Sequence, residues 1–474
     1  MQIIAGKLFD SYTGELVENQ LITVSPDSGL IIRVDKFEDK KEWFEERGIN
    51  LKDDTTIDLR GQTVLPGFVD THVHMFLHSY TETSWTDQVT RESLAERTIR
   101  ATAHARRTLM AGFTSVRDLG TEGAQDADLA LRKCLSGPNP IAVGPRYFTA
   151  NRAIVATGSY GPKNQLYPDR DGVEGVMGAE VADGEVECVK AVRRQIGAGA
   201  DWVKIYADYR VRANMQDVAP AIAGTSIGSF ADSEIGAMIT EAHRLGVKIV
   251  AHAQDASTLR RLTADANTHV DSIEHGYDMS VLLQDVPAAG YVFPAAAAAA
   301  TKEPLPLFWN PTLAVFYSQG GGGRGPAWQR AMQSFRLFLQ KRPRDVRIAC
   351  GGDTGAFPHG NNALEMRLMV QLGAPWREVL QWATLAGWEC IRSMRWEGRV
   401  GEARLARVEQ LQEDARVVGD NEVPFGAVRK GFAADIIATT GDFEKNFANA
   451  VDKGSIGFVM KAGKVYKRDG KEVA

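Results

Sequence analysis

The stretch TVLPGFVDTHVH, residues 63–74, places two histidines, His72 and His74, directly after a hydrophobic run. In a β-strand, residues two apart lie on the same face, about 6.6 Å apart along the strand. Both imidazoles of such a strand can therefore reach one metal ion. A strand that ends in two surface histidines is the alternative, and the stretch alone does not decide between the two.

The composition indicates a globular protein with one large domain and a smaller one, or with two comparable domains. The 474 residues include 55 Lys and Arg against 60 Asp and Glu, which gives a formal charge of −5, and no long basic run occurs. We therefore expect neither a nucleic acid nor an anionic membrane surface as a partner.

The four cysteines, Cys134, Cys188, Cys350 and Cys390, show no C-x-x-C spacing. The first residues lack the apolar core of a signal peptide, and no stretch approaches the roughly 20 apolar residues that span a bilayer. We expect reduced thiols and a cytoplasmic location. The run Ala295–Ala300 is too short for a membrane span and is typical of a plain helix turn.

Short alternating runs at both ends of the chain indicate small antiparallel strands. They are residues 21–24 and 30–34 near the N-terminus, and residues 434–438, 456–460 and 464–466 near the C-terminus. We predict that residues 1–64 and 424–474 together form one small β-sandwich domain, with the middle of the chain as an insertion.

Eight strand-like segments alternate with helical patterns in the middle of the chain, residues 65–395. The expected strands are Val64–His72, Thr114–Asp118, Ile141–Thr149, Trp202–Ala207, Val247–His252, Asp271–His275, Leu307–Val315 and Arg347–Asp353. Helical periodicity fills gaps such as 92–110, 185–196 and 234–245, the last with an N-cap at Asp232 or Ser233. Eight βα units predict an α/β fold, a (β/α)8 TIM barrel; an open doubly wound sheet is the alternative. Residues 396–423 are expected to form a charged insert.

Metal-ligand side chains stand at the ends of four of these strands. They are His72 and His74 on the first strand, His252 on the fifth, His275 on the sixth and Asp353 on the eighth. The carboxyl ends of barrel strands meet on one face, where active sites are built. Neutral imidazoles and a carboxylate suit first-row divalent metals, and zinc accepts them readily. The sequence therefore predicts a metal centre.

Lys204, on the fourth strand, does not suit this set as a protonated ammonium, because it offers no lone pair and is repelled by metal ions. If its amine reacts with carbon dioxide, the resulting carbamate is an anion whose two oxygens can bridge two metals. A lysine in an ordinary salt bridge of the barrel is the alternative.

With these residues in place, the chain resembles the amidohydrolase superfamily, in the imidazolonepropionase-like branch that includes metal-dependent prolidases and ochratoxin-hydrolysing amidases. The similar segments are 64–74, 112–118, 199–204, 272–276, 311–313, 352–354 and 430–435. They extend nearly from end to end of the chain, and together they are far more specific than the two histidines alone.

The resemblance implies a metal-dependent hydrolase that cleaves an amide bond of a dipeptide or N-acyl amino acid by means of a metal-bridging hydroxide. The implied ligands are His72, His74, carboxylated Lys204, His252, His275 and Asp353. The first two histidines would hold the more buried of two divalent ions, expected to be zinc, the other two histidines the more exposed one, and Lys204 would bridge them. Asp353 would also act as general base. The resemblance further implies a homo-oligomer and a small substrate that carries a carboxylate.

Two departures from the family pattern concern the substrate. The Gly-His pair that many relatives carry after the third strand is replaced by residues 156–162, which contain no histidine, and the glycine-rich segment after the bridging lysine is replaced by residues 206–210. The candidate substrate-binding residues are Tyr160, Tyr206, Tyr209, Arg210 and His359. The guanidinium of Arg210 could hold a substrate carboxylate through two hydrogen bonds, or it could pair with Asp208.

Two other functions stay open. A mononuclear cyclic-amide hydrolase or deaminase of the same superfamily would use one metal and dispense with Lys204. A non-catalytic scaffold of the same fold would have lost metal ligands. The exact substrate, the native metal and the number of subunits do not follow from the sequence.

Overall fold

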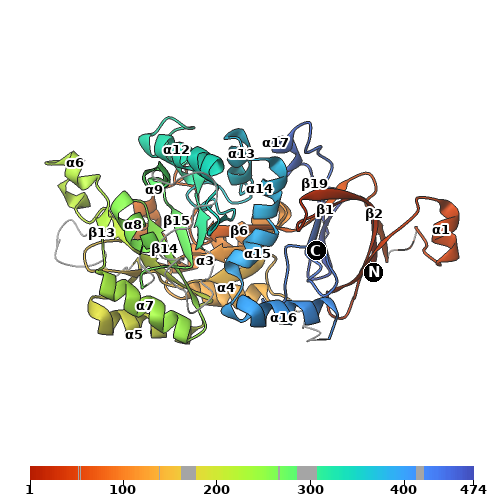
Figure 1. Cartoon of the computed structure of the whole chain (residues 1–474), viewed down its shortest axis with the longest axis horizontal. Helices are drawn as coiled ribbons and strands as arrows, with labels where there is room; N and C mark the ends of the chain where they lie inside the picture. The colour runs from red at the N-terminus through yellow and green to blue at the C-terminus, as the bar shows by residue number, and fades with distance from the viewer. Residues whose placement is uncertain are drawn as a thin grey trace.

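The computed structural model of the chain describes residues 1–51, 53, 55–137, 139–161, 178–264, 267–284, 307–412 and 421–473. The Ala295–Ala300 run lies outside the described residues. Parallel strands with helices around them form one part of the molecule, on the left in Figure 1. A sheet that contains both chain ends forms the other part, on the right.

The parallel strands belong to two sheets. The first has the order β6 (Phe68–Val73), β7 (Phe113–Asp118) and β8 (Arg146–Thr149). The second has the order β10 (Glu180–Val181), β9 (Ile154–Val155), β11 (Trp202–Tyr206), β14 (Lys248–Ala253), β15 (Ser272–His275), β16 (Leu307–Asn310) and β17 (Val346–Ile348). Strands β6, β7, β11 and β14 are buried along their whole length, as expected for parallel strands that are covered on both faces.

Backbone hydrogen bonds join the two parallel sheets at both ends. The amide of Thr71 in β6 donates to the carbonyl of Cys350 after β17, at 2.8 Å. The amide of Asp201, just before β11, donates to the carbonyl of Thr149 in β8, also at 2.8 Å. The first strand of one sheet therefore adjoins the last strand of the other, and β8 adjoins β11.

Helices follow most of the parallel strands. They are α2 (Trp85–Arg91), α3 (Leu94–Met110), α4 (Ala127–Leu135), α5 (Gly184–Ala198), α6 (Pro220–Ala223), α7 (Asp232–Arg244), α8 (Ala256–Ala264), α9 (Met279–Gln284), α11 (Leu313–Gln319), α12 (Pro326–Lys341), α13 (Leu364–Gln371), α14 (Trp376–Trp382), α15 (Leu385–Ile391) and α16 (Gly398–Glu409), with short 3-10 turns at Ala213–Met215 and Met394–Trp396. In α7 the buried residues Ile235, Met238, Ile239 and Ala242 recur at helical spacing, so one face packs on the strands.

The sheet of the two chain ends is mixed and has the order β21-β20-β19-β18-β5-β1-β2-β3, with β4 paired to β1. Its strands are β1 (Gln2–Asp10), β2 (Glu15–Val24), β3 (Ile31–Lys36), β4 (Thr56–Asp58), β5 (Thr63–Pro66), β18 (Ile436–Thr439), β19 (Ile456–Lys461), β20 (Lys464–Arg468) and β21 (Lys471–Glu472). The short helices α1 (Lys41–Glu46) and α17 (Phe447–Ala450) accompany it. The two ends of the chain thus pair in one sheet, and the boundaries that we predict for the domains stay predictions.

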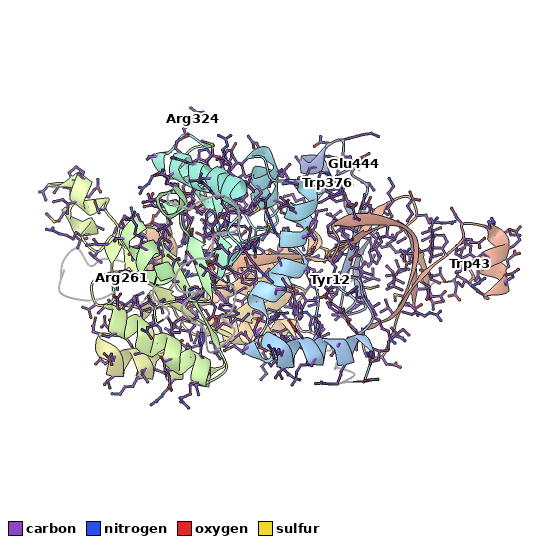
Figure 2. The ribbon with its side chains drawn as sticks, viewed as in Figure 1. Tyr12, Trp43, Arg261, Arg324, Trp376 and Glu444 are labelled. Atoms are coloured by element: carbon purple, nitrogen blue, oxygen red, sulfur yellow. The ribbon has the colours of Figure 1, made fainter. Side chains whose placement is uncertain are left out.

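Polar and aromatic contacts connect the two parts. The guanidinium of Arg146 in β8 pairs with the carboxylate of Asp435, 3.1 Å apart, and both side chains are buried. The ring of Trp376 in α14 stacks on Phe443 with centroids 5.6 Å apart. The neighbouring Arg377 lies 3.6 Å from Glu444. Figure 2 shows Trp376 and Glu444 close together where the two parts meet. The parallel strands and the terminal sheet therefore share a packed interface.

The structure corrects several predicted boundaries. The first predicted strand, 64–72, is divided at Gly67 between β5 of the terminal sheet and β6 of the parallel sheet. A Cβ atom at Gly67 would stand 2.0 Å from Oγ1 of Thr114 in β7. The chain at Gly67 therefore passes too close to β7 for any side chain. The strand predicted at 307–315 ends at Asn310, because Thr312 adopts a left-handed backbone with φ of 47° and helix α11 begins directly after it.

Two further boundaries differ. The strand predicted at 347–353 covers only Val346–Ile348, because the chain turns toward Asp353 in a loop. The N-cap predicted at Asp232 or Ser233 is wrong. The helix begins at Asp232, and the carboxylate of Glu234 accepts a hydrogen bond from the amide of Ala231 at 2.6 Å. This carboxylate satisfies one of the free amides at the helix start.

Within the predicted insert 396–423, residues 413–420 lie outside the described part. Helix α16 occupies Gly398–Glu409 and buries Val408 against a core cluster that includes Trp388 and Phe432. This helix is therefore packed on one face rather than fully solvated.

Among the described residues, none of the helices combines the length and apolar character that crossing a lipid bilayer requires.

Candidate metal centre

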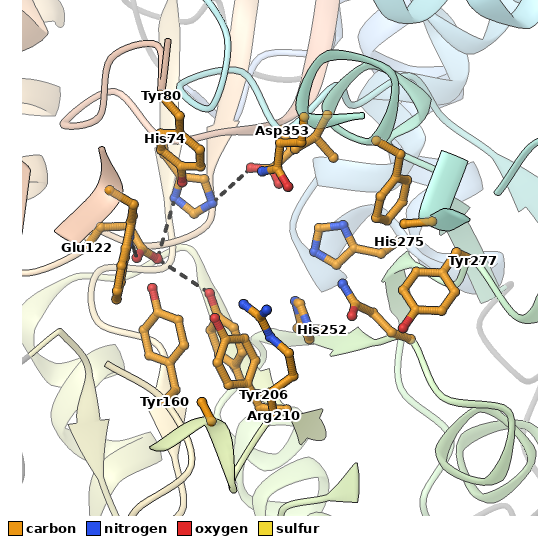
Figure 3. Close-up of a pocket in the computed structure, with 18 of the residues that line it drawn as sticks. His74, Tyr80, Glu122, Tyr160, Tyr206, Arg210, His252, His275, Tyr277 and Asp353 are labelled. Atoms are coloured by element: carbon orange, nitrogen blue, oxygen red, sulfur yellow. Dashed lines mark hydrogen bonds and ion pairs between the residues drawn. The ribbon is translucent and has the colours of Figure 1, made fainter. Parts of the chain in front are cut away.

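The six predicted metal ligands lie together at the carboxyl ends of the parallel strands. His72 and His74 come from the end of β6 and the residue after it, Lys204 from β11, His252 from β14, His275 from β15, and Asp353 from the loop after β17. The four histidines and Asp353 border a cavity of about 860 Å³. Figure 3 shows His74, His252, His275 and Asp353 around it. Parallel strands end at one edge, so residues far apart in the sequence converge there.

The distances among these groups suit metal ligation. Nε2 of His74 lies 3.3 Å from Oδ1 of Asp353, and Nε2 of His72 lies 3.6 Å from the same oxygen. One potential ligand atom from each of His72, His275 and Asp353 lies within 4.8 Å of the others. The rings of His252 and His275 are 4.4 Å apart between centroids. One ion could therefore contact several of these side chains at once.

Hydrogen bonds fix the orientation of three imidazoles. Nδ1 of His72 bonds to Oε2 of Glu274 at 2.7 Å, and Nδ1 of His74 bonds to the carbonyl of Gly120 at 2.8 Å. Nδ1 of His275 bonds to Oγ1 of Thr312 at 2.8 Å. When Nδ1 is held in this way, Nε2 keeps its lone pair for a metal, and such partners orient histidine ligands in metalloproteins.

Glu274 is the centre of a buried polar network beneath the ligands. Its carboxylate accepts from Nη2 of Arg117 at 2.8 Å, from Nδ2 of Asn310 at 2.9 Å and from Oγ of Ser272 at 2.6 Å. Nε of Arg117 donates to the carbonyl of Thr71 at 2.7 Å. Arg117 therefore makes internal polar contacts, and through Glu274 it supports a histidine of the site.

Burial controls the protonation of the site. It lowers the pKa of His72, His74, His252 and His275, so the imidazoles are neutral at pH 7. Neutral imidazole is the form that binds metal. Burial also raises the pKa of Asp353 to about 7, against the effect of the nearby Lys204, which lowers it.

Lys204 is buried among the other members of the cluster. It is 1% exposed, and its Nζ has no hydrogen-bond partner among the described residues. Burial lowers its pKa to about 8, while Glu274 and Asp353 oppose that shift. An unpaired buried ammonium is costly. Four neutral imidazoles and one carboxylate thus fit a site for divalent metal, and the buried amine of Lys204 lies among them without a hydrogen-bond partner in the described part of the chain.

Asp353 is held in a strained backbone conformation, with φ of 61°. A residue of this kind costs about 1–3 kcal/mol in the left-handed region and persists only where its surroundings enforce it. The carboxylate of Asp70 supplies that constraint, because it accepts from the amide of Gly352, from Oγ1 of Thr354 and from Nδ2 of Asn362.

The predicted substrate-binding residues Tyr160, Tyr206, Tyr209 and Arg210 line the cavity. Tyr206 stacks on His252 with ring centroids 4.6 Å apart and an angle of 22°, so it also holds a candidate ligand in place. The carboxylate of Asp208 accepts hydrogen bonds from Ser226 and from the amides of residues 254 and 255. Among the described residues, no carboxylate lies within ion-pair distance of the exposed Arg210, whose guanidinium lies 5.8 Å from the ring centre of Tyr209.

His359, the fifth predicted substrate-binding residue, lies outside the lining of the cavity. Its ring stacks on His104 with centroids 4.3 Å apart, and its Nε2 bonds to the carbonyl of Leu77 at 3.0 Å. His104 bonds to the carbonyl of Met75 at 2.9 Å. The two rings thus support the loop that follows His74, and a contact of His359 with substrate stays a prediction.

Several residues of the site do not appear in the sequence-based prediction. They are Glu274 beneath the ligands, and Tyr80, Trp85, Glu122, Tyr277 and Phe316 in the cavity wall. Glu274 directly precedes His275 and Glu122 follows β7 by four residues, so the strand-end rule could have found both. The aromatic residues come from loops and helices and carry no comparable signal.

Comparison with known proteins gives a consistent assignment. The model of the amidohydrolase family matches residues 63–302. No curated protein matches the chain significantly. Solved structures that are similar include a Xaa-Pro dipeptidase with bound methionine in its active site, with 22% identity over 98% of this chain and 99% of that one and a TM-score of 0.70. The A. niger ochratoxinase has 20% identity over 98% and 95% of the two chains and a TM-score of 0.69.

A further solved structure is a prolidase complexed with N-methylphosphonate-L-proline, which has 21% identity over 99% of this chain and 100% of that one and a TM-score of 0.70. At these identities the structural similarity concerns the fold. The family model covers more than half of the chain, and it includes the segment with His72, His74, Lys204, His252 and His275. The chain therefore belongs to the amidohydrolase family and is a hydrolase that acts on carbon–nitrogen bonds.

Proposed function

We propose that the protein is a binuclear, zinc-dependent amidase that cleaves a dipeptide or an N-acyl amino acid with a free carboxylate. In this proposal the two parallel sheets form one (β/α)8 barrel, residues 65–395, and residues 1–64 and 424–474 form the β-sandwich domain. The prolidase and ochratoxinase names of the similar structures support this choice of substrate class. A homo-oligomeric state and a cytoplasmic location stay predictions.

The observation that carries the proposal is the buried amine of Lys204, which has no hydrogen-bond partner among the described residues and lies beside four neutral histidines. A neutral amine can attack carbon dioxide: the N–C bond forms, one proton leaves the nitrogen, and a carbamate anion results. A pKa of about 8 keeps part of the amine neutral near pH 7. A site for one metal would have no use for this lysine, so the lysine favours two metals over one.

The ligands would be His72, His74, the carbamate of Lys204, His252, His275 and Asp353. Two divalent ions held there would lower the pKa of a water molecule toward neutrality and polarise an amide carbonyl. Asp353, beside the bound ions, would accept a proton from the attacking water and deliver it to the leaving amine. Arg210 would hold the carboxylate of the substrate at the rim of the cavity.

Metal content tests the proposal. Protein prepared with bicarbonate is expected to hold about two metals per chain, and Lys204→Ala to hold one or none and to lose dipeptide hydrolysis. Lys461→Met is the matched control, because it removes a buried lysine from β19 of the terminal sheet and should keep both metals. Carbon-13 bicarbonate should give a carbamate signal in the wild type that Lys204→Ala lacks. A single metal that is unaffected by Lys204→Ala would favour the mononuclear hydrolase or deaminase instead.

A further inference from the structure

The cavity contains a carboxylate that the proposed hydrolysis does not use. Glu122 lies four residues after the end of β7, its side chain is 4% exposed, and it contributes to the cavity wall. In Figure 3 it stands beside His74 and Tyr206, on the side away from Tyr277. It is therefore close to the candidate ligands without belonging to the predicted ligand set.

Neutral donors hold this carboxylate. Oε2 of Glu122 accepts from Nε1 of Trp85 at 3.1 Å, and Oε1 accepts from the hydroxyl of Tyr206 at 3.4 Å. Among the described residues, the one basic side chain within 4.0 Å is His74, whose Nδ1 is 3.9 Å away and bonds to Gly120 at the shorter distance of 2.8 Å. The guanidinium of Arg97 binds the main-chain carbonyl of Glu122 at 2.8 Å.

Aromatic rings flank the same carboxylate. Trp85 and Tyr160 are 5.8 Å apart between centroids, and Tyr160 stacks on Tyr206 at 4.3 Å. The face of an aromatic ring carries partial negative charge and attracts ammonium or guanidinium groups. Tyr206 is covered by Tyr160 and by His252, so its hydroxyl rather than its ring face contributes here. The carboxylate of Glu122 and the rings of Trp85 and Tyr160 are therefore the groups on this side of the cavity that would attract a cation.

The energetics also favour a cationic occupant. A carboxylate that is buried without a paired cation loses hydration that two neutral hydrogen bonds replace only in part. A cationic group of the ligand would supply the charged partner that this carboxylate lacks among the described side chains.

We propose that Glu122, Trp85, Tyr160 and Tyr206 form a subsite for a positively charged ammonium or guanidinium group of the substrate. The inference rests on the proposed amidase function and narrows its substrate class to amides that carry a cation near the scissile bond. Arg210 lines the same cavity. A dipeptide zwitterion carries one group of each kind, an ammonium for Glu122 and a carboxylate for Arg210.

Kinetics with metal-loaded protein tests whether substrates that carry an ammonium group are preferred. It also tells whether the preferred group is the α-ammonium or a side-chain ammonium. The three substrates are Ala-Phe with a free α-ammonium, neutral-ended N-acetyl-Ala-Phe, and N-acetyl-Lys-Phe with an ammonium on its side chain. At least one ammonium substrate should have a kcat/KM about 10-fold or more above that of N-acetyl-Ala-Phe. Glu122→Gln should reduce this ratio to about one. Glu82→Gln removes the same charge outside the cavity wall and should preserve the ratio.

Calorimetry provides a readout that does not need hydrolysis. The wild type should bind 2-phenylethylammonium about 10-fold or more tightly than 2-phenylethanol. Glu122→Gln should abolish this preference, and Tyr160→Leu, which keeps the charge but removes a ring, should reduce it. Equal binding of the two compounds to the wild type would overturn the subsite even if amides are cleaved. A preference for the ammonium compound without cleavage of any amide would retain the subsite and overturn the proposed amidase.

Discussion

At the scale of single residues, Glu274 determines how His72 faces the cavity. It also balances the guanidinium of Arg117, and neither side chain is exposed to solvent. Removal of one partner from a buried ion pair leaves the other charge uncompensated. A substitution at this position should therefore change both metal binding and stability.

We predict that Glu274→Gln weakens metal binding about 10- to 100-fold, because His72 loses its charged partner. The metal-free variant should also lose about 3–5 kcal/mol of unfolding free energy, because Arg117 becomes unpaired. Competition with a chelator and urea unfolding measure the two effects. The double variant Arg117→Met/Glu274→Gln should recover part of the stability but not the metal affinity. Unchanged stability in the single variant would contradict the assigned role of this ion pair.

Arg210 and Arg330 both line the cavity, but their environments differ. Arg330 is paired with the carboxylate of Asp278, whereas Arg210 has no carboxylate within ion-pair distance among the residues described. A charged hydrogen bond to a substrate carboxylate contributes about 1.5–3 kcal/mol. The two arginines therefore form a matched pair for substitution.

Arg210→Met should raise the KM for a dipeptide with a free carboxylate about 10- to 100-fold, and should affect the same dipeptide with an amidated C-terminus much less. Arg330→Met should have a smaller effect on both substrates. Steady-state kinetics with the two substrates measures the difference. If Arg210→Met changes KM equally for both, Arg210 does not bind the carboxylate.

At the scale of elements, α15 packs directly on β6, the strand that carries His72. A Cβ atom at Gly387 of α15 would stand 2.6 Å from Cβ of Val69 in β6. Cβ of Val69 is attached directly to the backbone of β6, so a change of side-chain rotamer cannot move it away. Helix α15 would therefore have to shift away from β6. By contrast, a Cβ atom at Gly197 in α5 would meet no heavy atom within 4 Å, and this glycine is exposed.

Gly387→Ala should destabilise the protein by about 1–3 kcal/mol through overpacking. Gly197→Ala should stabilise it by up to about 1 kcal/mol, because alanine favours the helix. Urea unfolding of both variants compares the same chemical change in two helices. Equal effects at the two positions would show that the contact between α15 and β6 can relax without cost.

At the scale of the whole molecule, buried polar groups connect the terminal sheet to the parallel strands. Besides the pair of Arg146 with Asp435, the ammonium of Lys461 in β19 donates to the carbonyl of Gly144 at 2.6 Å. Burial lowers the pKa of Lys461 from 10.5 to about 7, with Arg146 acting in the same direction. The lysine therefore couples the stability of the molecule to pH.

Between pH 7 and 10.5 the unfolded chain binds more protons at Lys461 than the folded chain does. The contribution of this group to stability is therefore complete above pH 10.5 and is lost as the pH falls toward 7. In the wild type, the unfolding free energy should rise with pH across this window by up to about 1.4 kcal/mol per unit relative to Lys461→Met. Denaturant unfolding of both proteins at several pH values gives the difference. A flat difference would show that Lys461 keeps its ordinary pKa in the folded protein.

Much of the architecture is predictable because hydrophobic periodicity is local. The fully buried strands β7, β11 and β14 coincide closely with the predicted segments. Predictions failed where a distant contact controls the backbone. The segment after Asn310 forms α11 rather than strand, and the carboxylate of Glu365 accepts from the amides of Leu313 and Ala314 at its start.

The sequence by itself determined which histidines stand at the strand ends, because His72, His252 and His275 each end a strand-like segment that can be read locally. Only the tertiary structure decided what surrounds them. Glu274 meets His72 across 202 residues of chain, and Glu122 meets Tyr206 across 84. Such contacts depend on how whole strands and loops are placed in three dimensions. The partners that orient the histidines, the burial of the Lys204 amine and the carboxylate of Glu122 in the cavity wall therefore become visible only in the folded molecule.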